Sequence, residues 1–99
     1  MPIDLHKQHQ ARDDLLEIWL YTAEEWGAEQ ADRYLDLIQA GFDRLRENPF
    51  LGTDCSSIRS GYRRLTVERH RIFYTVEAKR VEIVRVLHPG MDAGAQLEE

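Results

Sequence analysis

Three short runs of alternating apolar and polar residues follow one another closely in the second half of the chain. They limit its possible folds more than any other feature, and they cover residues 64–67, 71–76 and 81–87. Successive side chains of a strand point to opposite faces, so these runs predict a three-stranded antiparallel meander with turns near 68–69 and 78–80. The third run is apolar on both faces except at Glu82 and Arg85, which is typical of a strand covered on both faces.

The first half of the chain carries the pattern of two amphipathic helices. The first runs from about Ala11 to Glu25, and its apolar face comprises Ala11, Leu15, Ile18, Trp19, Thr22 and Trp26. Its opposite face is acidic, is interpreted as solvated, and comprises Asp13, Asp14, Glu17, Glu24 and Glu25. The second runs from about Ala28 to Arg46, with an apolar stripe of Ala31, Leu35, Ile38, Phe42 and Leu45. Gly27 ends the first helix and Asn48-Pro49 ends the second, so the pair is expected to form an antiparallel hairpin.

Together these segments predict a single α+β domain, in which a small antiparallel sheet packs against an α-helical hairpin. Residues 2–7 alternate like a strand and are expected to join the sheet of the meander. The expected order is a strand in 1–10, the helical hairpin in 11–47, a loop in 48–61, the meander in 62–88 and a tail in 89–99. The tail is interpreted as a turn followed by loose structure. A chain of 99 residues can bury one core but no enclosed cofactor cavity, so no cofactor is expected.

The sequence has no feature of a membrane or secreted protein. No apolar run approaches the roughly 20 residues that cross a bilayer, and the first ten residues lack the apolar segment of a signal peptide. The single cysteine, Cys55, can form no internal disulfide. A cytoplasmic location without a membrane partner is therefore expected.

Charge is distributed unevenly along the chain. Residues 1–49 hold eleven acidic and five basic residues, whereas residues 59–88 hold eight basic and three acidic ones. A basic sheet behind acidic helices can meet an anionic partner on one side only. Ordinary solvated charge explains the same pattern, so both interpretations stay open.

Motifs for nucleotide, metal or catalytic chemistry are weak or missing. The chain has neither GxxxxGK[ST] nor GxGxxG. His6 and His9 form an H-x-x-H that His88 and Cys55 could complete, but without paired cysteine spacing no metal site is expected. The polar cluster with the chemistry to act on RNA comprises Arg63, Arg64, Arg69, Arg71, Arg85 and His88. Several of its arginines alternate with core positions, and edge-strand charges that oppose aggregation are the favoured explanation over catalysis.

Short segments in a fixed order extend over nearly the whole chain. They are Asp14-Leu15, Ile18, Tyr21, Trp26-Gly27, Gln30-Ala31, Tyr34, Phe42, Leu45, Asn48-Pro49, Gly52, Arg59–Arg63, His70, Ile72, Tyr74, Arg85, Leu87-His88 and Met91-Asp92. With the order strand, helical hairpin and meander, they resemble the RelE/ParE superfamily of bacterial toxins, and ParE in particular. The resemblance implies a toxin that inhibits DNA gyrase, blocks replication and is neutralised by a ParD-type antitoxin.

A gyrase inhibitor of this kind acts by binding and is not itself an enzyme, and no sequence-specific binding to nucleic acid by this chain is expected. The alternative is a RelE-like endonuclease that cuts messenger RNA on the ribosome, with His88 as its catalytic residue. The net charge of −5 and the absence of a tyrosine after Tyr74 disfavour that alternative. An inactive protein that keeps the fold and only binds is a third interpretation.

Two sets of residues are hypothesised to bind partners. The target-binding set lies on the basic meander and the tail, and comprises Arg63, Arg64, Arg85, His88, Met91 and Asp92. The antitoxin-binding set lies off the main stripe of the first helix, and comprises Leu16, Leu20 and Tyr21. Contact with the second helix is the more ordinary explanation of the second set.

Overall fold

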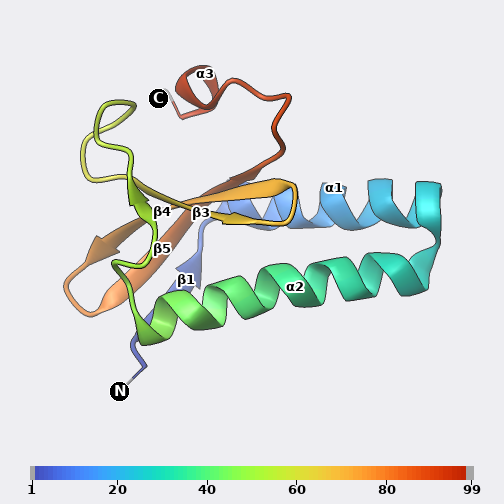
Figure 1. Ribbon diagram of the computed structural model, residues 1–99, viewed down its shortest axis with the longest axis horizontal. Coiled ribbons are helices and arrows are strands. Elements are labelled where there is room, and N and C mark those ends of the chain that lie inside the picture. Colours follow the sequence, from blue (N-terminus) through green and yellow to red (C-terminus); the bar gives the residue numbers. More distant parts are fainter. Residues whose placement is uncertain (1, 98–99) are drawn as a thin grey trace.

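The computed structural model describes residues 2–97 and shows a five-stranded sheet with a helical hairpin across one face (Figure 1). The elements are β1 (Asp4–Lys7), α1 (His9–Trp26), α2 (Ala28–Glu47), β2 (Thr53–Asp54), β3 (Arg63–Val67), β4 (His70–Glu77), β5 (Arg80–Leu87) and α3 (Ala93–Gln96). The predicted α+β class is confirmed, and both long helices end within two residues of their expected bounds. Within the described residues no helix is both long enough and apolar enough to span a bilayer.

The sheet has the strand order β1-β5-β4-β3-β2, and the predicted meander forms its centre. Two-residue turns join its strands, because Val67 pairs with His70 and Glu77 pairs with Arg80. The first turn residues, Glu68 and Ala78, have φ of 53° and 49°. Tight hairpins need positive φ at these places, which glycine or asparagine normally supplies. The pairing of the strands therefore holds two ordinary residues in a left-handed conformation.

The edges of the sheet differ from the expectation in two details. β1 runs parallel to β5, in the register Asp4 to Arg80, so the sheet is mixed rather than wholly antiparallel. Alternation of apolar and polar residues predicts a strand but carries no information on its direction. Within the expected loop, β2 pairs with the start of β3, Thr53 opposite Arg64.

Both faces of the sheet are covered by apolar residues. The helical hairpin covers one face with a core that includes Ile38, Phe42 and Leu45, and Ile72 and Val81 meet them from the sheet. A second cluster lies on the opposite face and comprises Cys55, Phe73, Leu87, Ala93 and Leu97. The tail supplies two of its members, so the expectation of loose structure after residue 89 was wrong. β4 and β5 carry apolar residues on both faces, and the helical hairpin covers only one of them, so the other face is buried by the tail.

The far end of the helical hairpin projects beyond the sheet (Figure 1). Trp26 was predicted on the packing stripe, but it lies at this end and is 74% exposed. Trp19 is half-buried, and its Nε1 donates to Asp32 of α2 at 2.8 Å. The helical period predicts which face an apolar residue occupies, but not how far along the helix the neighbouring sheet extends.

Candidate functional surfaces

The first surface is an apolar ledge on α1, formed by Leu16, Leu20 and Tyr21. These side chains are 58%, 52% and 65% exposed, so contact with α2 does not bury them. Leu16 and Leu20 are four residues apart and lie side by side on one face. Tyr21 lies about 100° further around the helix and extends the ledge to its flank. Half-exposed apolar side chains gathered on one helix are typical of an interaction surface.

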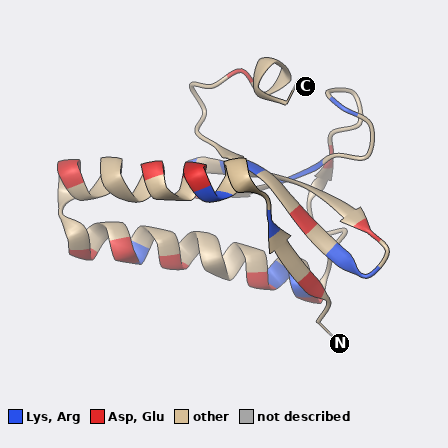
Figure 2. Cartoon of the chain, turned by 180° about the vertical axis from the view of Figure 1, so that it is seen from behind, with Lys and Arg blue, Asp and Glu red and all other residues tan. Residues whose placement is uncertain are grey.

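Acidic residues border this ledge. Figure 2 shows them at intervals along both helices of the hairpin, whereas most lysines and arginines lie in the sheet and its loops and the others lie on the helices. Glu17 and Glu24 follow Leu16 and Leu20 along α1, and both are exposed. A partner segment that presents apolar side chains flanked by basic ones complements such a surface.

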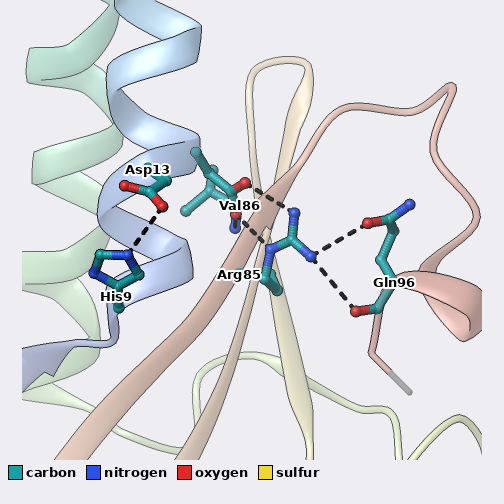
Figure 3. Close-up of polar contacts among 6 residues, drawn as sticks. His9, Asp13, Arg85, Val86 and Gln96 are labelled. Carbon is teal, nitrogen blue, oxygen red and sulfur yellow. Dashed lines mark hydrogen bonds and ion pairs between the residues drawn. The ribbon is translucent and has the colours of Figure 1, made fainter. Parts of the chain in front are cut away.

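The second set of hypothesised residues is centred on Arg85, which links three elements (Figure 3). Its guanidinium forms a double hydrogen bond with Asp14 of α1, with Nε to Oδ2 at 2.7 Å and Nη2 to Oδ1 at 2.9 Å. Its Nη1 donates to the backbone and side-chain oxygens of Gln96, at 3.5 and 3.2 Å. The Asp14 carboxylate also accepts from the Val86 amide at 2.9 Å. The side chains of Arg85 and Asp14 are only 12% and 11% exposed.

The hydrogen bond from Arg85 to Asp14 raises the pKa of the guanidinium. β1 ends at Lys7, opposite Ile83, so within residues 2–97 the remainder of β5 has a neighbouring strand, β4, on one side only. Asp14 therefore takes the place of a strand neighbour for the Val86 amide while it pairs with Arg85. Both residues have a structural role that the sequence did not indicate.

The remaining members of the target-binding set lie in different surroundings. Arg63 Nη2 donates to the carbonyls of Phe50 and Gly52, at 3.2 and 2.7 Å, and its guanidinium lies over the Phe50 ring. Arg64 is half-buried and stands opposite Phe73 in the sheet, as Arg85 does on the other side. The sheet thus places Arg64 and Arg85 on the face that the tail covers, whereas Arg63 anchors the loop before β2.

The tail residues also differ from one another in exposure. His88 is exposed, and its Nδ1 accepts from the Gly90 amide at 3.1 Å. Met91 packs against the second apolar cluster. Asp92 caps α3 by accepting from the amides of Gly94 and Ala95. Of the six hypothesised residues, the half-buried Arg64 makes no side-chain hydrogen bond or ion pair within residues 2–97, and the exposed His88 ring accepts a hydrogen bond only from the nearby Gly90 amide.

A third group is centred on His70, which is one of the residues that resemble the toxin superfamily but belongs to neither hypothesised binding set. The Tyr34 hydroxyl of α2 accepts from the Arg69 amide at 3.2 Å and lies 2.6 Å from His70 Nδ1. A hydroxyl oxygen has two lone pairs, so the contact with Nδ1 is either Tyr34 donating to the ring or an Nδ1–H of His70 donating to Tyr34, depending on the His70 tautomer. The His70 ring meets the His88 ring edge to face, with centroids 6.5 Å apart. Burial and the nearby His88 lower the pKa of His70 to about 4.

This lowered pKa predicts a loss of stability in mild acid. Below about pH 6.5 the unfolded chain binds a proton at His70 that the folded chain does not bind, so the contribution present above pH 6.5 is lost as the pH falls towards 4. Allowing for partial exposure, the loss is expected to be about 1–3 kcal/mol. Urea unfolding at pH 7 and pH 4.5 should therefore show a larger decrease in the free energy of unfolding for the unaltered protein than for His70→Gln. His9→Gln, at an exposed position, is the control; equal losses in native protein and His70→Gln would contradict the assignment.

The histidines of the H-x-x-H motif pair with two different carboxylates. His6 Nδ1 lies 2.9 Å from Oε1 of the buried Glu82, which also accepts from Gln8 at 3.4 Å. His9 lies 3.3 Å from the Asp13 carboxylate in the first turns of α1. Burial alone would raise the pKa of Glu82, but the hydrogen bonds from His6 and Gln8 and the charge of Arg80 together lower it. Among residues 2–97, no three His, Cys, Asp or Glu side chains are placed to hold a metal ion.

The chain matches known proteins over most of its length. Residues 7–93 match the model of the ParE toxin of the type II toxin–antitoxin system parDE. The chain is 44% identical to Toxin ParE1 of Caulobacter vibrioides over 87 residues, and 42% identical to Toxin ParE1 of Mycobacterium tuberculosis over 88 residues. Each alignment covers 88% of this chain and 90% of the relative. A solved chain from a chromosomal ParDE system of P. aeruginosa has the same fold, with a TM-score of 0.77, 24% identity and coverage of 87% and 95%.

Proposed function

Because the chain belongs to the ParE toxin family of type II toxin–antitoxin systems, we propose that it binds DNA gyrase, blocks DNA replication, and is neutralised by a ParD-type antitoxin. The observation that carries the proposal is the family match, which covers residues 7–93, from the last residue of β1 to the first residue of α3. Such a toxin acts by holding its target in an unproductive state, which requires surfaces rather than a catalytic centre.

The ledge on α1 is the proposed docking site of the antitoxin. Its apolar side chains are exposed on a rigid helix, and the exposed Glu17 and Glu24 lie beside them. An amphipathic segment with apolar and basic side chains would bury the ledge and pair with its rim. An antitoxin segment that folds only on binding loses conformational entropy, and its contacts have to offset that loss. The affinity therefore depends strongly on the few apolar anchors.

Substitution of Leu16 and Leu20 by serine is expected to weaken antitoxin binding by about 10- to 100-fold, because each removes a central apolar contact. The fold should remain, since both side chains are more than half exposed. Calorimetric titration with the purified antitoxin measures the effect. Leu37→Ser, at an exposed position of α2 outside the ledge, is the matched control. Unchanged affinity in the double variant would exclude the ledge.

The proposed gyrase-binding set is the basic face and the tail, with Arg64 and His88 as its testable members. Arg64→Glu is expected to raise the toxin concentration needed to inhibit supercoiling by roughly 10-fold or more, because it reverses a charge on the basic face that is proposed to meet an anionic surface of the target. Arg63, Arg85, Met91 and Asp92 also belong to the proposal, but their internal contacts mean that their substitution disturbs the fold as well. Arg33→Glu on the distant α2 is the control. If Arg64→Glu and His88→Ala inhibit supercoiling at the same concentration as the unaltered toxin, this assignment is wrong.

A supercoiling assay with purified gyrase, run beside a translation assay with ribosomes, tests the function itself. Lost supercoiling with accumulation of cleaved DNA and intact translation is the expected result. Messenger RNA cut on the ribosome, with gyrase unaffected, would instead identify a RelE-like endonuclease. His88 would then be the residue to replace, since its exposed ring lies against that of His70. If the protein affects neither supercoiling nor translation, it is a binding protein without toxic activity.

A further inference from the structure

The C-terminal segment crosses the face of the sheet that lies opposite the helical hairpin. Residues 89–97, here called the strap, leave the end of β5, loop outward and return as α3 over the sheet (Figure 1). Ala93 and Leu97 of the strap are buried against Phe73, Leu87 and Cys55. The strap therefore completes the second apolar cluster, while the core under the helical hairpin contains none of its residues.

Side chains, rather than strand pairing, hold the strap in place. In the described part of the chain its backbone amides bond locally: Met91 to His88, Gln96 to Asp92 and Leu97 to Ala93. Three arginines of the domain donate to strap carbonyls. They are Arg71 to Met91 at 2.8 Å, Arg85 to Gln96 at 3.5 Å, and Arg59 to Leu97 at 3.2 Å. No strap backbone group among residues 2–97 joins the hydrogen-bond ladder of the sheet.

We propose that the strap detaches as a unit from an otherwise intact domain and uncovers an apolar face bordered by arginines. α3 has only four residues, which is too short to be stable without its contacts. When the strap leaves, Arg85 keeps its double hydrogen bond to Asp14, so the link between α1 and β5 remains. The uncovered face presents Phe73 and Leu87, with Arg71 over the Phe73 ring. This opening does not depend on the identity of the toxin's target.

The single cysteine reports the opening directly. Cys55 is 5% exposed in the apolar cluster that Ala93 and Leu97 of the strap complete, so iodoacetamide reaches its thiol only when that cluster opens. For a local opening, the labelling rate at low urea depends little on urea, because little surface is exposed. Near the unfolding midpoint the rate should rise steeply, as global unfolding takes over. A steep dependence at every urea concentration would overturn the proposal.

Two variants separate the strap from the rest of the domain. Leu97→Ala removes a buried strap side chain and is expected to accelerate Cys55 labelling at low urea by roughly 10-fold or more. Leu45→Ala removes a buried side chain of the other core, and should lower global stability without changing that rate. If Leu45→Ala accelerates labelling at low urea as much as Leu97→Ala does, the thiol is reached by global unfolding alone.

Amide exchange distinguishes strap opening from movement of the loop that carries Cys55. The Leu97 amide bonds within the strap, whereas the Cys55 amide bonds to the Tyr62 carbonyl within the loop. Detachment of the strap should expose the Leu97 amide with the same opening constant as the thiol, while the Cys55 amide exchanges at least 10-fold more slowly. Equal exchange of both amides would show that the loop opens with the strap, which contradicts a separate strap.

Discussion

Replacement of Asp14 by alanine is expected to lower the free energy of unfolding by about 3–5 kcal/mol. The change leaves the guanidinium of Arg85 in a site where only 12% of its side chain is exposed, without the carboxylate that neutralises it. It also removes the acceptor of the Val86 amide. A buried charge that loses its partner retains its full desolvation cost, so the loss exceeds the net value of the pair. Urea unfolding of the purified variant measures the effect.

The double variant Asp14→Ala/Arg85→Met separates the two contributions. Methionine fills much of the arginine volume without a charge, so the double variant should recover a large part of the loss. The unpaired Val86 amide remains and sets the residual cost. The exposed pair of Arg33 and Glu29 on α2 is the control, and Glu29→Ala should leave the midpoint of unfolding unchanged. An effect of Asp14→Ala no larger than that of Glu29→Ala would contradict a structural role for the pair.

The role of Asp14 also shows where sequence analysis reached its limit. Helical periodicity placed Asp14 on the acidic face of the first helix, and the same periodicity correctly identified Ile38 and Phe42 as core. Its partner lies 71 residues away on β5, and no local spacing reports such a distance. Local patterns predict elements and faces, because side-chain direction follows the period of the backbone. They do not predict which polar residues meet after the layers pack.

The predictions for the strap and for Trp26 were wrong for a related reason. The tail lacks periodicity, yet Ala93 and Leu97 are buried because the second face of the sheet needs a cover. Trp26 continues the apolar stripe of α1, yet it is exposed because the sheet ends before the tip of the hairpin is reached. In both cases burial depends on the extent of a neighbouring layer. The position of Leu16, Leu20 and Tyr21 off the stripe was compatible with an exposed ledge and more simply with contact to α2, and their exposure of more than half shows that α2 does not bury them.

Gly52→Ala is expected to lower the free energy of unfolding by about 3 kcal/mol, at the upper end of the cost of overpacking. Gly52 is buried beside Tyr74, and its amide donates to the Tyr74 hydroxyl at 2.9 Å. An added Cβ would lie 2.6 Å from that hydroxyl oxygen and 2.7 Å from the Arg64 carbonyl oxygen. Neither group can move away without a cost in free energy, because the Tyr74 ring is fully buried and the Arg64 carbonyl belongs to β3.

The damage should spread through the hydroxyl of Tyr74, which also donates to the Pro49 carbonyl at 2.8 Å. Displacement of the ring would break both hydrogen bonds and leave buried polar groups unpaired, in addition to the steric cost. Gly94→Ala is the matched control, because Gly94 is exposed in α3 and an added Cβ meets only the Asp92 carboxylate, at 3.3 Å. Thermal unfolding should show a clear decrease for Gly52→Ala and almost none for Gly94→Ala. Equal midpoints for the two variants would mean that the loop before β2 adjusts freely, and that Tyr74 does not fix it to the core.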